Sequence, residues 1–191
     1  MTVSTPLLTA LGGNDTLARK LAMVLFGSVL VGMSAQISVP MYPVPMTLQT
    51  LAISLIGLTY GARLAGVTLL AYLAQGAAGM PVFAGGASGL AYMAGPTGGF
   101  LIGFVAMAWL TGFLVERGLA RGFGRLFLAA FIPALLLFLP GVMWLWAVTP
   151  LDLERAVMAG AVPFQLGGLV KSAVAALIVT GAWAAWTARR S

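Results

Sequence analysis

The sequence predicts an all-α membrane protein in which six transmembrane helices form one compact bundle. Hydrophobic residues make up 61% of the 191-residue chain, which has ten basic and four acidic residues. The stretches 21–62 and 64–115 carry no charge at all. Because a hydrocarbon core of ~30 Å needs ~20 helical residues per span, the chain has room for about six spans. Nothing in the composition marks a second domain, so residues 1–191 are expected to form a single membrane domain.

The first span is expected at about 17–38, with Asp15 or Thr16 as its N-cap. Residues 1–16 lack the basic start and cleavage site of a secretory signal, and they are expected to form a cytoplasmic tail.

Ala18 and Ala22 lie four residues apart on one face of this first span. Small residues at that spacing allow helices to approach closely. Packing within the bundle is the commoner use of such a pair, and docking of a partner protein is the alternative.

Two short spans are expected next, at 47–60 with Thr47 as N-cap and at about 64–78. Each reaches only ~22 Å, less than the thickness of the hydrocarbon core. Their far ends therefore leave a recess, which the segments 39–47 and 79–97 must fill. Both segments contain too much proline or glycine to be straight helices, and irregular chain at membrane depth must be buried in protein or line a cavity. We expect them to wall a site.

The fourth span is expected at 98–116, with Thr97 as its cap, and the fifth at 126–147. Pro133 and Pro140 should bend or interrupt the fifth span.

A short surface helix is expected at 150–159, because Thr149 resembles a cap and is followed by a proline and an acid. The last span follows at 163–186.

Basic residues orient the bundle, because cytoplasmic loops are enriched in lysine and arginine. Six spans with both termini in the cytoplasm leave only Arg155 in an outer loop. The segments 39–47, 79–97 and 148–162 then face outside. Nucleic-acid binding is not expected, since the basic residues fall at span ends and not on one face. The basic residues that fall inside are Arg19, Lys20, Arg63, Arg117, Arg121, Arg125, Arg189 and Arg190.

Missing residue types exclude several function classes. The chain has no cysteine and no histidine, which excludes thiol nucleophiles, Ser-His triads and histidine metal ligands. No phosphate-binding loop of the Gly-x-x-x-x-Gly-Lys type occurs. We therefore expect no catalytic residue, metal or cofactor, and any uphill transport must draw its energy from another protein. The acidic residues lie at or beyond span ends, where they cannot couple transport to an ion: Asp15, Glu116, Asp152 and Glu154.

Lys171 is the only charged residue inside a predicted span, ~12 Å below its outer end. An idle lysine at such a depth costs ~2.5–3.5 kcal/mol, although snorkelling to the interface is an alternative. Gly167 and Gly168 precede it on the same helix face and leave space beside it. The N-termini of spans two, four and six point at the same recess, so we expect Lys171 to attract an anionic ligand.

Further candidate contacts lie in the second span and the 79–97 segment. Gln49, Ser88 and Tyr92 can add hydrogen bonds, and Phe83 can contribute to an apolar wall. Each of them also has a purely structural explanation. Together they suggest a small ligand with a carboxylate and an apolar body.

Four segments resemble the signature segments of BioY, the biotin-binding S component of energy-coupling-factor (ECF) transporters. The likeness extends from about residue 20 to 180, and the segments are 43–50 (PVPMTLQT), 79–86 (GMPVFAGG), 95–100 (GPTGGF) and 163–171 (PFQLGGLVK). It implies six helices, a pocket open to the outside of the bacterial cytoplasmic membrane, and biotin as the ligand. It also implies a membrane scaffold subunit and ATPase subunits as partners.

The resemblance assigns roles to particular residues. S components are thought to dock their scaffold through small residues of the first helix, which favours the docking interpretation of Ala18 and Ala22. Gly85 and Gly86 belong to the loop expected to close over the ligand. Family members usually have Gly-Asp-x-x-Lys in the last helix, where the Asp helps to bind the ligand. Here Lys171 is retained but Gly168 occupies the Asp position, so the groups that recognise the ureido ring stay open.

The sequence thus predicts a subunit that takes up biotin from outside, with Lys171 pairing with the carboxylate. An S component for another carboxylate-bearing vitamin, or a facilitator that works alone, is the alternative. A membrane enzyme is poorly supported, because no span carries paired polar groups. A purely structural subunit would leave Lys171 without a purpose. Whether the chain also forms a homo-oligomer stays open.

Overall fold

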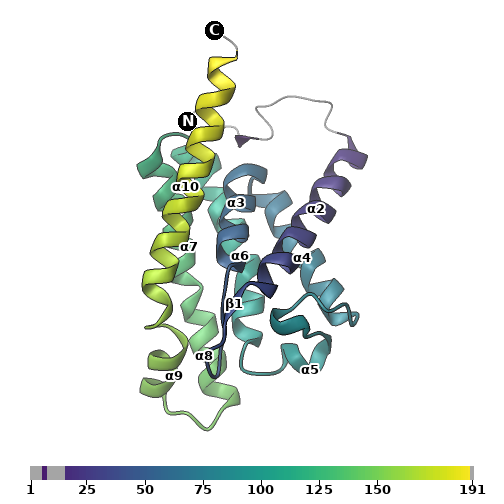
Figure 1. Cartoon of the computed structure of the whole chain (residues 1–191), viewed down its shortest axis with the longest axis vertical. Helices are drawn as coiled ribbons and strands as arrows, with labels where there is room; N and C mark the ends of the chain where they lie inside the picture. Colours follow the sequence, from purple (N-terminus) through teal and green to yellow (C-terminus); the bar gives the residue numbers. More distant parts are fainter. Residues whose placement is uncertain (1–5, 8–15, 190–191) are drawn as a thin grey trace.

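A computed structural model describes residues 6–7 and 16–189, which form a bundle of helices with one short hairpin (Figure 1). The elements are α2 (Leu17–Gln36), β1 (Ser38–Val39), β2 (Met46–Thr47), α3 (Gln49–Tyr60), α4 (Ala62–Ala77), the 3₁₀ turn η1 (Ala84–Gly86), α5 (Gly89–Met93), α6 (Gly98–Leu114), the π-helical turn η2 (Val115–Leu119), α7 (Phe123–Leu136), α8 (Phe138–Val148), α9 (Leu153–Gly160) and α10 (Phe164–Ala188).

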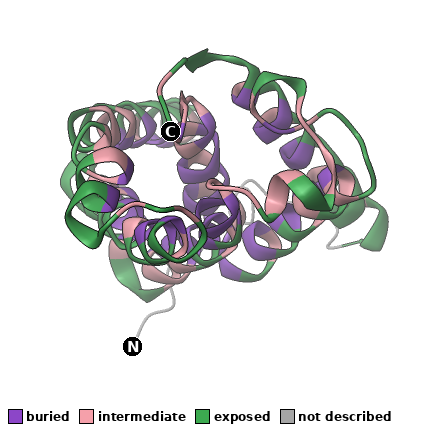
Figure 2. Ribbon diagram, turned by 90° about the horizontal axis from the view of Figure 1, so that it is seen from below, coloured by how far each residue is buried: buried purple, intermediate pink, exposed green. Residues whose placement is uncertain are grey.

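Helix length and composition agree with a membrane protein. Among the described residues, four helical stretches are long and apolar enough to cross a membrane: Leu17–Gln36, Gly98–Leu119, Phe123–Val148 and Leu153–Ala188. α3 and α4 have 12 and 16 residues, which matches the two short helices that the sequence predicts. Large apolar side chains are exposed along the outside of the bundle, as in Leu25, Leu70 and Leu177. Figure 2 shows the buried residues turned toward the interior, where the helices meet.

Some predicted helix starts are confirmed and others are wrong. The Thr16 hydroxyl accepts the Arg19 N–H at 3.3 Å and caps α2, whereas Asp15 lies outside the described residues. The prediction that Thr149 caps the surface helix is wrong, because α9 begins at Leu153 and the Asp152 carboxylate accepts the Arg155 N–H at 2.8 Å.

Thr149 fails as a cap because its hydroxyl donates to the Leu145 carbonyl at 2.7 Å, back along α8. The prediction that Thr47 is the N-cap of the second span is also wrong, because α3 begins at Gln49 and Leu48 is its N-cap. Thr47 lies one residue earlier, where its hydroxyl accepts the Gln49 N–H at 3.2 Å.

The fifth predicted span is interrupted, as expected from its prolines. α7 ends at Leu136 and α8 begins at Phe138, so the break falls between Pro133 and Pro140. The break turns Leu137 inward, where it is 4% exposed.

α6 is the central helix and packs against α3, α4, α7 and α8. Its contact with α8 is unusually close: a Cβ at Gly99 would overlap Trp144 and the Pro140 carbonyl. Trp144 also donates its indole N–H to the Gly95 carbonyl at 3.0 Å. Glycine at position 99 therefore lets the backbones of two helices meet.

The connections separate into two sets at opposite ends of the bundle. At one end, the Glu116 carboxylate accepts the Ala62 N–H at 2.9 Å, and the Arg121 guanidinium lies 4.6 Å from the Trp183 ring centre. The hairpin, α5 and α9 lie at the other end, while α2 begins and α10 ends at the first (Figure 1). Segments predicted to face the same side of the membrane thus lie together.

The two irregular segments, 39–47 and 79–97, meet as predicted, since residues of both line one groove. The end of α2 also contacts the second segment. Gln36, at the end of α2, donates its amide to the Phe83 carbonyl at 3.0 Å and accepts the Gly86 N–H at 2.9 Å. Residues 38–47 form an antiparallel hairpin in which Ser38 pairs with Thr47. The sequence predicts extended chain here but not the pairing of its two ends.

Candidate ligand-binding site

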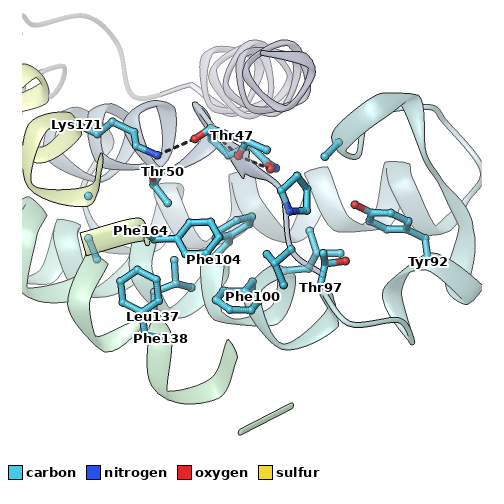
Figure 3. Close-up of a pocket in the computed structure, with 17 residues that line it drawn as sticks. Thr47, Thr50, Tyr92, Thr97, Phe100, Phe104, Leu137, Phe138, Phe164 and Lys171 are labelled. Carbon is cyan, nitrogen blue, oxygen red and sulfur yellow. Dashed lines mark hydrogen bonds between the residues drawn. The ribbon is translucent and has the colours of Figure 1, made fainter. Parts of the chain in front are cut away.

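A cavity opens at the hairpin end of the bundle, between the hairpin, α3, the 79–97 segment, α6, α7, α8 and α10 (Figure 3). It holds about 690 Å³ of empty space, including its open mouth. The lining residues are Val44, Pro45, Thr47, Gln49, Thr50, Ala84, Tyr92, Thr97, Phe100, Leu101, Phe104, Ala134, Leu137, Phe138, Phe164, Gly168 and Lys171.

Lys171 supplies the positive charge of this cavity. It lies on α10, is half-buried, and donates from Nζ to the Thr47 carbonyl at 2.8 Å. The side chain therefore points into the protein and does not snorkel along the lipid face. Among the described lining residues none is acidic, and an ammonium group can donate further hydrogen bonds. The charge is available to an anionic group of a ligand.

Aromatic rings form the opposite, apolar wall. The Phe138 ring packs against Phe100 and Phe164, with centroid distances of 6.4 and 6.2 Å. Phe104 and Leu137 complete this wall (Figure 3). A molecule with a flat apolar body and an acidic end fits such a division of the cavity.

A chain of hydrogen bonds leads from the cavity to the 79–97 segment. Thr47 donates its hydroxyl to Gln49 Oε1 at 2.9 Å, and Gln49 Nε2 donates to the Tyr72 hydroxyl at 2.8 Å. Tyr72 then donates to the Val82 carbonyl at 3.1 Å. Since Lys171 bonds the Thr47 backbone, these hydrogen bonds link α10, α3 and α4 to the 79–97 segment, the outer loop.

Four of the sequence-predicted contacts line the cavity: Lys171, Gly168, Gln49 and Tyr92. A Cβ at Gly168 would have no atom within 4 Å, so the space there is open as expected. The expectation for Gly167 is wrong, because a Cβ there would lie 3.2 Å from the sulfur of Met46. Gln49 is 4% exposed and uses both ends of its amide within the protein. Gln49 therefore supports the cavity wall through its bonds to Thr47 and Tyr72 and exposes little of its side chain to the cavity.

The other predicted contacts lie elsewhere. Phe83 is fully buried behind the wall, stacked on Tyr92 at 5.3 Å and edge-on to Tyr72 at 5.6 Å. Gly85 borders a neighbouring groove on the outer surface, which Tyr92 also lines.

Gly86 and Ser88 do not line the cavity or this groove. Gly86 binds Gln36 through its N–H. The 79–97 segment thus approaches the cavity through Ala84 and Tyr92.

Sequence reasoning missed Thr50 and the aromatic wall. Apolar residues of a span look alike whether they face lipid or a cavity, so no pattern distinguishes Phe100, Phe104 or Phe138. The only sequence signal for Thr50 is its spacing, three residues after Thr47, which places the two residues close together at the start of α3. That spacing alone does not indicate a cavity.

Ala18 and Ala22 are exposed on the outer face of α2, so they do not pack within the bundle. Ala22 borders an apolar groove between α2 and α3, which Phe26, Leu55 and Tyr60 also line. Among the described residues no group of three or more acidic side chains could hold a metal ion.

Comparisons with known proteins agree with this geometry. The sequence model of the BioY family matches residues 4–188. The probable biotin transporter BioY of Pyrococcus horikoshii is 36% identical over 161 residues, which cover 84% of this chain and 94% of the relative. The biotin transporter BioY of Rhizobium etli is 37% identical over 163 residues, covering 81% and 87% of the two chains.

A solved structure shares the fold. The crystal structure of the S-component for biotin from an ECF-type ABC transporter superposes with a TM-score of 0.78 at 22% identity. The match covers 88% of this chain and 93% of that one.

Proposed function

The chain belongs to the BioY family, and from this premise we propose that it is the biotin-binding S component of an ECF transporter. It is a multi-pass protein of the cytoplasmic membrane and acts in transport, not in catalysis. One observation carries the proposal: among the described residues that line the cavity, Lys171 is the single cation, and aromatic rings form an apolar wall of the same cavity. Biotin has the matching parts, a carboxylate on an apolar tail and a compact fused ring system.

In this proposal Lys171 pairs with the biotin carboxylate. Gly168 leaves room beside it, and Tyr92 and Ala84 bring the 79–97 segment over the ligand. Gly85, Gly86, Phe83 and Ser88 then act on the ligand indirectly, by shaping the segment that covers it.

We also propose six membrane crossings in one domain, with α3 and α4 as the two short ones. The end of the bundle that holds Arg63, Arg117 and Arg121 then faces the cytoplasm, together with both termini. The cavity opens outward, where biotin arrives. The short spans are tolerated because the hairpin and the 79–97 segment fill the membrane depth that they leave.

The partners follow from energetics. The sequence has no phosphate-binding loop of the Gly-x-x-x-x-Gly-Lys type, and its acidic residues lie at or beyond the proposed span ends. We therefore propose that scaffold and ATPase subunits drive uptake, with no cofactor bound to this chain. Ala18 and Ala22, exposed on α2, are the proposed contact with the scaffold.

Calorimetric titration of the purified chain with biotin tests the proposal. The unsubstituted chain should bind biotin, and Lys171→Ala should weaken binding by about 100-fold, because a hydrogen-bonded ion pair is lost. Lys20→Ala, at the other lysine of the chain, is the matched control and should bind as before. Undiminished affinity in Lys171→Ala would remove the lysine from the site, and tighter binding of another carboxylate-bearing vitamin would replace biotin as the ligand.

A further inference from the structure

Thr50 carries a buried hydroxyl without a partner. It lies in the first turn of α3 and lines the cavity. Among the described residues, its Oγ1 is the buried side-chain oxygen for which the protein provides no hydrogen bond. Buried polar groups nearly always have a partner, so such an exception needs an explanation.

The position of Thr50 explains why the protein itself does not satisfy the hydroxyl. Helical threonines usually donate to the carbonyl four residues earlier, as Thr59 does to Leu55 at 2.7 Å and Thr111 does to Met107 at 2.8 Å. Four residues before Thr50 the chain is the strand β2, not a helix. The acceptor of the preceding turn is therefore out of place.

The neighbourhood of Thr50 favours an anion. Figure 3 shows Thr50 beside Lys171 on the same wall of the cavity. Lys171 and Thr50 are both donors, and the N-terminus of α3 adds its partial positive charge. The nearby carbonyl of Thr47 accepts from Lys171, whereas the Thr50 hydroxyl makes no hydrogen bond to it or to any other protein group.

We propose that the Thr50 hydroxyl donates a hydrogen bond to the carboxylate that Lys171 binds, and that the two residues together select the charged end of the ligand. The inference rests on the proposed function and adds to it a second specificity-determining residue. Lys171 supplies charge, whereas Thr50 supplies a directed donor at the start of α3. The fused rings of the ligand then lie against the aromatic wall, away from Thr50.

The test compares two ligands and two substitutions at Thr50. Affinities of the purified chain are measured for biotin and for biotin methyl ester, which has the same rings but no charge. Thr50→Val keeps the shape and removes the hydroxyl, and Thr50→Ser keeps the hydroxyl. We expect Thr50→Val to weaken biotin binding about tenfold or more, and ester binding by less than about threefold, since charge-assisted hydrogen bonds are roughly twice as strong. Thr50→Ser should stay within about threefold of the unsubstituted chain for both ligands.

Thr59→Val is the matched control, because Thr59 lies on the same helix with its hydroxyl already bonded to Leu55. It should leave both affinities unchanged, and thermal unfolding of each variant checks folding. An equal loss for biotin and its ester in Thr50→Val would place the hydroxyl at the rings and overturn the inference, as would no loss at all. If the unsubstituted chain bound no biotin, the proposed function itself would fail, and this inference with it.

Discussion

At the scale of single residues, the site combines a lysine, whose charge is unfavourable inside a membrane, with a glycine, which has no side chain. Lys171 must lie in the protein interior, because a lysine in contact with lipid at that depth is unfavourable. Gly168, one turn before it, offers only space. The charge attracts a ligand and the missing side chain admits it.

Gly168→Leu should therefore weaken biotin binding without unfolding the chain. A leucine side chain would occupy the open space beside Lys171, and overpacking of this kind costs ~1–3 kcal/mol, or roughly 5- to 150-fold in affinity. Equilibrium binding to the purified variant measures the loss.

The control for this prediction lies on the same helix. Gly181 of α10 also has open space around its Cβ, but it is exposed and does not line the cavity. Gly181→Leu should bind biotin like the unsubstituted chain. Equal affinities of the two leucine variants would contradict the proposed position of the ligand.

Single residues also show where sequence reasoning reaches its limit. The place of Lys171 can be predicted, since few environments tolerate a charge in a span. Phe100 and Phe138 cannot be assigned in the same way, because lipid and a ligand cavity both accept an apolar ring. Thr149 and Asp152 are equally good caps by type, and only the bond from Thr149 to Leu145 decides between them.

At the scale of elements, the outer loop is held by polar bonds from two helices. Gln36 of α2 binds the Phe83 carbonyl and the Gly86 N–H, and Tyr72 of α4 binds the Val82 carbonyl. The loop therefore does not depend on its own apolar contacts alone. Proline and glycine content predicts that this segment is irregular. The bonds from Gln36 that hold it join residues 47 and 50 positions apart in the sequence, so no local sequence pattern predicts them.

Gln36→Ala should speed the release of biotin. Two bonds to the loop are lost, together worth ~1–3 kcal/mol, so dissociation should be at least about fivefold faster. Stopped-flow chase of a labelled biotin measures the rate. Gln165→Ala is the control, because Gln165 is exposed and bonds within its own helix turn, to the Ala161 carbonyl at 3.1 Å. A release rate unaffected by Gln36→Ala would show that the loop does not retain the ligand.

The opposite end of the bundle depends on a cap that comes from another helix. Gly61 precedes α4 and has no side chain to cap it, and the Glu116 carboxylate accepts the Ala62 N–H in its place. Glu116→Ala should lower stability by ~0.5–2 kcal/mol, the usual cost of a lost cap, or about 2–4 °C in Tm per kcal/mol.

Thermal unfolding in detergent measures this loss. Glu116→Gln keeps a side-chain oxygen, so its Tm should lie between those of Glu116→Ala and the unsubstituted chain. Glu154→Ala, at an exposed position of α9, is the control and should leave Tm within about 1 °C. A Tm of Glu116→Ala equal to that of the control would show that the cap contributes nothing.

At the scale of the whole molecule, the two ends of the bundle are different in kind. One end has arginines and short turns, and the other has the hairpin, the 79–97 segment and the cavity. Composition predicts a helical membrane bundle, and the positions of charges, prolines and glycines along the chain predict which helices are long. The structure has four long apolar helices among the described residues. The cavity needs tertiary structure, since its lining comes from segments as far apart as Val44 and Lys171.

Ligand binding and uptake should be separable, because the cavity and the exposed face of α2 lie on different surfaces. Ala22→Trp places a large side chain on the outer face of α2, where the scaffold is proposed to dock. It should abolish biotin uptake in cells that express the scaffold and ATPase subunits, while the purified variant binds biotin with unchanged affinity. Ala106→Trp, at an exposed alanine of α6, is the control and should leave uptake intact. Uptake that persists in Ala22→Trp would exclude this face of α2 as the docking site. Uptake in cells lacking those subunits would indicate that the chain transports biotin alone.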